Sequence, residues 1–227
     1  INITQIYGDD NITSNHGTFI AGVIGGYNVG VMRLKDSPFV KLIDVKLGSS
    51  ALSEFMNAFD SIIDYLNTTN RKGIINLSYS NYGNGVTPII NRIEEIYNLN
   101  GIIFCSAGND NTNASLYYPP SSPYTITVGN HESNLLKYLS SNYGDAVDIY
   151  GPGSDIYSTS YESDSAFTTG TGTSYAAPFV AGVAANILLS NPDYDFDNLL
   201  TKLLDYAEYD IIDRNGKTDE PRVQISC

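Results

Sequence analysis

Apolar residues form two kinds of pattern that alternate along the chain. Short, mostly apolar runs predict buried strands, and longer stretches in which apolar residues recur every three or four positions predict helices. The runs that predict strands are Phe39–Lys46, Gly73–Tyr79, Gly101–Ser106 and Tyr124–Val128, and the intervening helical patterns are Ser53–Leu66 and Pro88–Leu99. Strands that alternate with helices in this way are typical of a parallel sheet with crossover helices.

The last third of the chain continues with shorter strands and two further helices. Val147–Tyr150 and Ile156–Ser158 predict a short strand pair, because a tight glycine-proline-glycine turn lies between them. An alanine-rich helix is predicted over Ser174–Leu189 and an amphipathic helix over Asp197–Tyr206. No internal repeat, heptad array or linker divides the sequence, so we expect one domain over residues 1–227.

Composition restricts the class of protein to which the chain can belong and the kinds of partner that it can bind. Apolar residues make up 42% of the chain and charged residues 16%, which favours a globular protein over a disordered one. The net charge of −13 disfavours nucleic acid and anionic membranes as partners. Cys105 and Cys227 are too few for a disulfide framework, and their spacing does not resemble a zinc site. No loop supplies a ligand set for calcium either, and we expect neither a metal nor a cofactor.

The first candidate for chemistry is Ser174. A glycine-rich loop, Gly170–Thr173, delivers this serine to the start of the predicted helix, which continues through two alanines to Pro178. Since first-turn N–H groups lack intrahelical partners, we expect Pro178 in that turn and a negative charge to be stabilised beside Ser174. The pattern predicts a nucleophilic serine, and a serine that only caps the helix is the other interpretation.

The second candidate is His16, which opens another predicted helix. We expect the small residues Gly17, Ala21 and Gly22 to let this helix pack closely in the interior. A hydroxyl nucleophile needs a nearby base with a pKa near 7, and His131, the only other histidine, falls in a predicted polar loop. His16 is therefore the better candidate for the base, and a capping or core histidine is the alternative.

The third candidate is Asn109, which follows a predicted strand in the sequence Ser106-Ala107-Gly108-Asn109. Acyl transfer needs hydrogen-bond donors aimed at the oxygen that becomes negative, and a carboxamide with a backbone N–H supplies two of them. An ordinary glycine-asparagine turn is the alternative interpretation.

Together, these motifs resemble the three later signature blocks of the subtilases, the subtilisin-like serine peptidases. The segments that carry the resemblance are His16–Thr18, Ile74–Ser78, Ser106–Asn109, Leu139–Thr159 and Gly172–Pro178. The likeness extends over nearly the whole chain, from about residue 14 to about residue 206. It implies a three-layer α/β fold with a mostly parallel sheet and helices on both faces, lacking the family's first strand.

The resemblance also implies roles for individual residues in a serine endopeptidase. Ser174 would attack the scissile carbonyl, His16 would take and return its proton, and Asn109 with the Ser174 N–H would form the oxyanion hole. Two strand edges would hold an extended peptide or protein substrate between them. These edges are Ser78-Tyr79-Ser80 and Ser106-Ala107-Gly108. Secretion or a cell-surface location is a further expectation from the family.

One member of the family's catalytic triad has no counterpart in the sequence. Subtilases carry an aspartate in an Asp-Thr/Ser-Gly block at the end of an early strand, and no such block precedes His16. Asp9 and Asp10 are the only acidic residues there, and we interpret them as a solvated loop. The aspartate strand is expected to be trimmed from the chain, supplied by an N-terminal segment or second chain, or lost. Its absence would expose a sheet edge that could pair with another chain.

Other classes of protein fit the sequence less well. An α/β-hydrolase would need glycine where Ala176 stands, and would place its histidine after the serine. The glycines near residues 22–26 and 170–172 match neither a dinucleotide-binding motif nor a P-loop. The serious rival is a catalytically impaired pseudoprotease that binds extended peptides without cutting them.

Overall fold

The structure is a computed structural model and describes residues 3–8, 15–32, 39–69 and 71–207. Asp9 and Asp10 lie outside the described residues. The helices are α1 (His16–Gly25), α2 (Leu52–Thr69), α3 (Thr87–Asn98), α4 (Thr173–Ser190) and α5 (Phe196–Asp205), with a short 3-10 helix at Ala114–Leu116. The strands are β1 (Ile3–Tyr7), β2 (Leu42–Val45), β3 (Gly73–Leu77), β4 (Asn81–Tyr82), β5 (Gly101–Ser106), β6 (Tyr117–Tyr118), β7 (Thr125–His131), β8 (Ile149–Pro152), β9 (Ile156–Thr159) and β10 (Phe167–Gly170).

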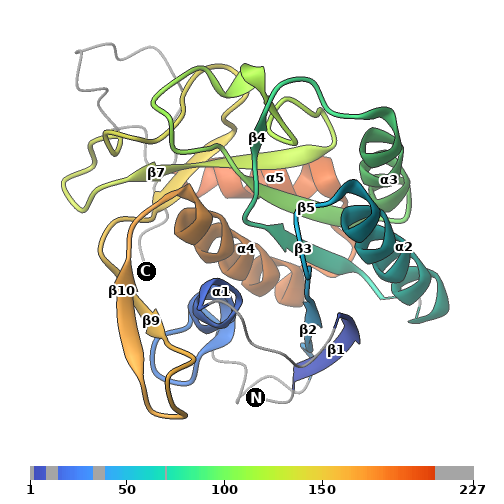
Figure 1. The fold of residues 1–227 in the computed structure, drawn as a ribbon, viewed down its shortest axis with the longest axis horizontal. Coiled ribbons are helices and arrows are strands. Elements are labelled where there is room, and N and C mark those ends of the chain that lie inside the picture. Colours follow the sequence, from blue (N-terminus) through green and yellow to red (C-terminus); the bar gives the residue numbers. More distant parts are fainter. Residues whose placement is uncertain (1–2, 9–14, 33–38, 70, 208–227) are drawn as a thin grey trace.

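A parallel sheet in the order β3-β5-β7-β8 forms the centre of the fold (Figure 1). Helices α2 and α3 cover one face of this sheet, and α4 and α5 cover the other. The predicted three-layer architecture is therefore confirmed. Among the described residues, three further ladders lie apart from this sheet: the parallel pair β1-β2 and the antiparallel pairs β9-β10 and β4-β6.

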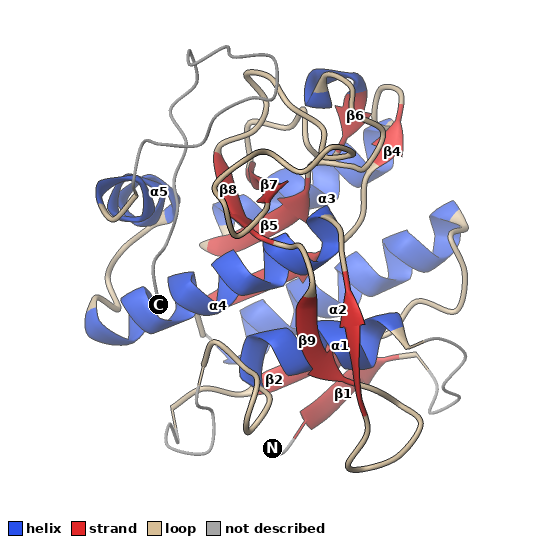
Figure 2. Cartoon of the chain, turned by 90° about the vertical axis from the view of Figure 1, so that its left-hand side faces the viewer, coloured by secondary structure: helices blue, strands red, loops and turns tan. Residues whose placement is uncertain are grey.

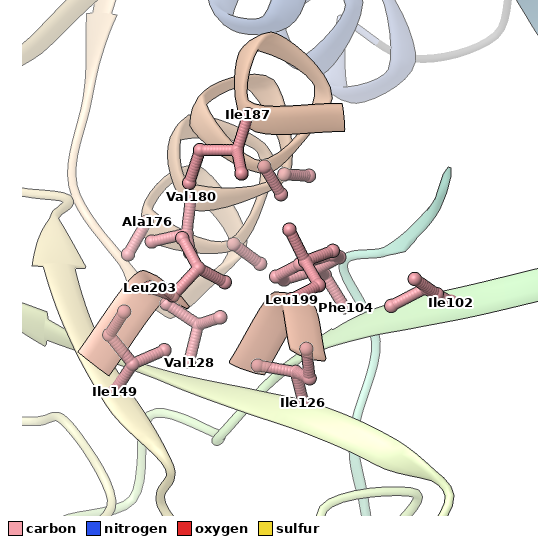
Figure 3. Packing of buried hydrophobic residues seen from close by; sticks show 13 residues of the cluster. Ile102, Phe104, Ile126, Val128, Ile149, Ala176, Val180, Ile187, Leu199 and Leu203 are labelled. Carbon is pink, nitrogen blue, oxygen red and sulfur yellow. The ribbon is translucent and has the colours of Figure 1, made fainter. Parts of the chain in front are cut away.

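The core consists of two apolar clusters, one on each side of the sheet. Side chains alternate between the faces of a strand, so Ile102 and Phe104 of β5 face α4 and α5, whereas Ile103 faces α2 and α3. In the first cluster, Val180 of α4 packs with Leu199 of α5 above the sheet (Figure 3). Although α4 is long and apolar enough to cross a membrane, half of it is buried inside this core. Its apolar composition is explained by that burial.

The strands and helices predicted from periodicity are present within a few residues of their expected bounds, but the predicted pairing of β8 with β9 is wrong. β8 lies parallel to β7 and completes the central sheet, whereas β9 pairs with β10 in an antiparallel hairpin. The backbone turns at Asp155, which has a φ of 55°, and β9 then leaves the sheet. β8 thus pairs with the strand before it in the sequence and β9 with the strand after it, and short apolar runs do not show which neighbouring strand they pair with.

Asp148 is an ionisable group at the edge of the core. Its carboxylate accepts a hydrogen bond of 2.7 Å from the N–H of Thr127, and its own N–H donates to the Thr127 carbonyl. Burial nevertheless raises the pKa of Asp148 from 3.8 to about 6. The charged carboxylate is therefore disfavoured in the folded chain.

We predict that Asp148→Asn stabilises the chain above pH 6 by about 1–3 kcal/mol. A folded-state pKa raised above the unfolded value means that wild-type stability falls as pH rises from about 4 to about 6. The asparagine oxygen still accepts from Thr127 but carries no charge. Urea unfolding at pH 4 and pH 8 measures the effect: the variant should gain stability relative to wild type only at the higher pH, and an equal change at both would contradict the assignment.

Candidate active site

Ser174 is the second residue of α4 and is half-buried. The helix begins at Thr173, so Ser174 lies in the first turn, as the sequence predicts. Successive helical side chains are separated by about 100° around the axis. Thr173 and Tyr175 therefore point to either side of Ser174, and each of them contacts one of the other candidate residues.

Asn109 contacts α4 through the residue before the serine. Its Oδ1 atom accepts hydrogen bonds from the backbone N–H of Thr173 at 2.9 Å and from the Thr173 hydroxyl at 3.1 Å. The same hydroxyl is 3.3 Å from the N–H of Gly108, and Thr173 is fully buried. Because the oxygen is held on this side, the amide nitrogen of Asn109 is directed away from Thr173. Sequence reasoning missed Thr173, since a threonine next to the serine carries no distinctive signal of this role.

His16 contacts α4 through the residue after the serine. Its ring centroid lies 5.9 Å from that of Tyr175, which also packs against Phe19 at 4.4 Å. One side of the imidazole is thus covered, although much of the residue lies at the surface. Burial lowers the pKa of His16 below 6.5, which favours the neutral base at physiological pH.

Helix α1, which carries His16, is anchored on β9 (Figure 2). The hydroxyl of Ser158 donates to the carbonyl of Phe19, and the hydroxyl of Thr159 donates to the carbonyl of Thr18, both at 2.8 Å. Gly22 is necessary for this approach, because an added Cβ would lie only 2.2 Å from the Thr159 hydroxyl. The prediction of close packing is confirmed for Gly22.

For Gly17, the prediction of close packing is wrong. A Cβ at this position would meet nothing within 4 Å, because the residue is exposed in the first turn of α1. Its small size is therefore not required by packing.

Pro178 lies deeper in α4 than the sequence analysis expected. The helix begins at Thr173, so Pro178 is inside the helix rather than in its first turn. A proline has no N–H to donate to the carbonyl four residues earlier, which here is that of Ser174. The hydroxyl of Ser78 donates to this carbonyl instead, at 2.7 Å. The end of β3 is thereby joined to the residue that carries the candidate nucleophile.

The two expected substrate edges lie side by side. A Cβ added to Gly108, whose φ is +106°, would lie 3.2 Å from the Ser80 hydroxyl. Residues 78–80 are half-buried just beyond β3, whereas Ser106, Ala107 and Gly108 are buried.

The backbone of the second edge is already engaged within the protein. The N–H of Ala107 donates to the Val128 carbonyl, and the Gly108 carbonyl accepts from the N–H of Asn142. Contact between this edge and a substrate stays a prediction. Because the Ala107 N–H and the Gly108 carbonyl are already hydrogen-bonded within the protein, we expect this contact to be van der Waals packing.

Asn142 holds the turn that contains Asn109. Its Nδ2 donates to the carbonyl of Ala107 at 2.9 Å, and its Oδ1 accepts from the N–H groups of Asp110 and Thr112. Asn142 is fully buried. Sequence analysis missed this function because residue 142 is more than thirty positions from the turn.

His131 is not in a polar loop, contrary to the sequence analysis. It is the last residue of β7, is 3% exposed, and its Nδ1 lies 2.8 Å from the carbonyl oxygen of Glu132. Burial lowers the pKa of this histidine. Among the residues that the structure describes, no group of three or more histidine, cysteine, aspartate or glutamate side chains could hold a metal ion.

Comparison with known proteins places the chain in a family. The model of the subtilase family matches residues 4–219. The chain belongs to the subtilase family. A solved structure described as a cold adapted subtilisin-like serine proteinase is similar to it with a TM-score of 0.83 and 28% identity, covering 99% of this chain and 82% of that one.

Curated relatives of this subtilase include several fungal proteases. An alkaline proteinase of Hapsidospora chrysogena is 35% identical over 78% of this chain and 43% of its own length. A subtilisin-like protease 2 of Arthroderma otae is 36% identical over 76% of this chain and 41% of its own. Alkaline protease 1 of Aspergillus clavatus is 33% identical, with shares of 80% and 44%. The subtilase chain thus spans less than half the length of these relatives.

We predict that Asn142→Ala destabilises this subtilase by roughly 2–4 kcal/mol, because it leaves the buried Ala107 carbonyl and the partly buried N–H groups of Asp110 and Thr112 without their partner. Urea unfolding measures the loss. The matched control is Asn91→Ala, since Asn91 is exposed on α3, and its effect should stay within about 0.5 kcal/mol. Equal stability of the two variants would show that Asn142 does not hold the turn.

Proposed function

We propose that this subtilase is a serine endopeptidase in which Ser174 is the nucleophile and His16 its general base. The supporting observation is that the two neighbours of Ser174 contact the other two candidates. Thr173 is hydrogen-bonded to Asn109, and Tyr175 packs against His16. A peptide carbonyl beside Ser174 would thus have a base on one side and a carboxamide on the other.

The proposed chemistry follows the order that an acyl transfer requires. Neutral His16 takes the proton of the Ser174 hydroxyl as its oxygen bonds to the peptide carbonyl carbon, and then gives that proton to the departing amine. Water, deprotonated in turn by His16, attacks the acyl-enzyme ester, and His16 returns that proton to the departing Ser174 oxygen as the acid is released. The lowered pKa of His16 keeps the imidazole in the basic form.

Negative charge on the carbonyl oxygen would be stabilised by two donors. The N–H of Ser174 is in the first turn of α4, where N–H groups have no intrahelical partner, and the helix dipole is positive there. The amide nitrogen of Asn109 is the second donor, because Thr173 already holds the carboxamide oxygen.

The substrates proposed are extended peptides and protein segments, held along residues 78–80 beside the buried wall of residues 106–108. The triad carboxylate is proposed to come from an N-terminal segment or a second chain, because the sequence before His16 has no Asp-Thr/Ser-Gly block. Secretion or a cell-surface location is part of the same proposal. A pseudoprotease that only binds peptides is the alternative.

A fluorophosphonate probe tests the nucleophile. The wild-type chain should be labelled on Ser174, and Ser174→Ala should lose labelling. Labelling should rise with pH and be half-maximal below pH 6.5, because the base must be neutral and burial lowers its pKa. Peptide binding without labelling, in the chain supplied with a carboxylate segment, would favour the pseudoprotease.

Asn109→Ala tests the oxyanion hole. We predict a fall in kcat of about 10²–10³ with little change in KM, because the donor acts on the transition state. Kinetics on a fluorogenic peptide measure both constants, with Asn91→Ala as the matched control. A rise in KM at unchanged kcat would assign Asn109 to substrate binding instead.

A further inference from the structure

The backbone of His16 is fixed by contacts on both sides of the residue. The side-chain oxygen of Asn15, the preceding residue, accepts a hydrogen bond of 2.9 Å from the N–H of Tyr161. After it, the carbonyls of Thr18 and Phe19 accept hydrogen bonds from the hydroxyls of β9. These contacts do not fix rotation about the two side-chain bonds of the histidine, which decides where the ring nitrogens lie.

One side of the imidazole is covered by Tyr175 of α4, the residue after Ser174. The two ring centroids are 5.9 Å apart and the ring planes are tilted by 53°. Aromatic rings at this separation and tilt attract each other. Because α1 lies beside α4 (Figure 1), a single side chain joins the ring of the candidate base to the helix that carries the candidate nucleophile.

The ring of Tyr175 is itself held against α1. Its centroid lies 4.4 Å from that of Phe19, and the two ring planes are tilted by 49°. Phe19 is only 2% exposed and belongs to the core. Since residues three positions apart lie on the same face of a helix, Tyr175 spans one turn of α1 and contacts both His16 and Phe19. The buried phenylalanine therefore fixes the ring that covers the histidine.

The ring of Tyr175 also lies against Gly170, the last residue of β10. A Cβ added to Gly170 would lie 2.8 Å from Cε2 and 2.9 Å from Cζ of the tyrosine. The φ of Gly170 is not in the left-handed region, so the backbone conformation does not require a glycine here. The glycine is instead required by the ring, which contacts both α1 and β10.

We propose that Tyr175 is a positioning residue whose ring holds the imidazole of His16 in the orientation that Ser174 requires, and that Gly170 leaves the space for this ring. The hydroxyl of Tyr175 has no part in this, because both aromatic contacts are made by the ring. Displacing a catalytic group by about 1 Å can cost about 100-fold in rate. This effect on rate rests on the proposed function, whereas the orientation of the imidazole does not.

Nuclear magnetic resonance measures the orientation without a substrate. The chain contains two histidines, so isotope-labelled histidine gives separate signals for His16 and His131. Three-bond couplings about the Cα–Cβ bond should report one rotamer of His16 in the wild type and in Tyr175→Phe, and an average over rotamers in Tyr175→Ala. The signal of buried His131 shows that each variant is folded. An average over rotamers in the wild type, or an unchanged single rotamer in Tyr175→Ala, would overturn the proposal.

Gly170→Ala displaces the ring instead of removing it, and tests the same claim where Tyr175→Ala does not fold. The added Cβ should shift the ring, move the imidazole signal of His16 and lower kcat about tenfold. In the Tyr175→Ala background the same glycine substitution should change neither the signal nor kcat, since no ring is left to displace. An unmoved His16 signal in Gly170→Ala, or an equal effect in both backgrounds, would overturn the proposal.

Kinetics on a fluorogenic peptide measure the consequence for catalysis. Tyr175→Ala should lower kcat by about 10–100-fold and leave KM within about twofold, and Tyr175→Phe should recover most of the lost kcat. The matched control is Tyr27→Ala, since Tyr27 is 64% exposed just after α1, and it should keep both constants within about twofold. A raised KM at unchanged kcat would show that Tyr175 binds substrate instead. If the wild-type chain neither cleaves nor is labelled while the imidazole orientation depends on Tyr175, the positioning of the ring stands and the peptidase proposal fails.

Discussion

The two hydrogen bonds from Thr173 to the side-chain oxygen of Asn109 are the interaction on which the arrangement of the site depends. They join the end of a buried strand to the first turn of a buried helix. Each bond contributes only about 1 kcal/mol net, so their main effect is orientation rather than stability. Because Thr173 holds the side-chain oxygen of Asn109, it also determines the direction of the Asn109 amide nitrogen. The hydrogen bonds from Asn142 to the same turn fix the position of the turn.

A second constraint comes from a missing donor. Pro178 cannot supply the N–H that the Ser174 carbonyl would otherwise receive, and the hydroxyl of Ser78 takes its place. The start of α4 is therefore held by the ends of β3 and β5 together. Because β3 is an edge strand of the central sheet in the described part of the chain, the position of this sheet edge and the geometry around Ser174 are physically connected.

The sequence was sufficient to predict the layers, because helical and strand periodicity are local signals, whereas the roles of its three candidate residues stay predictions. It could not predict which strands pair, since β8 pairs with β7 and β9 with β10, and the residues of β8 and β9 do not specify these partners. Asn142 and Thr173 were missed for the same reason. Gly17 and Gly22 look alike in the sequence, yet only Gly22 meets another element. The contacts of Asn142, Thr173 and Gly22 are with segments far away in the sequence, which local patterns do not show.

The central claim is that Ser174, His16 and Asn109 converge on one carbonyl. A crystal structure of the chain after reaction with a peptidyl phosphonate would test it most directly. The account predicts a covalent bond from Ser174 Oγ to phosphorus, with a phosphonyl oxygen about 2.7–3.1 Å from the amide nitrogen of Asn109 and the His16 ring beside the serine oxygen. A phosphonate attached elsewhere, or an Asn109 amide turned away from it, would contradict the account.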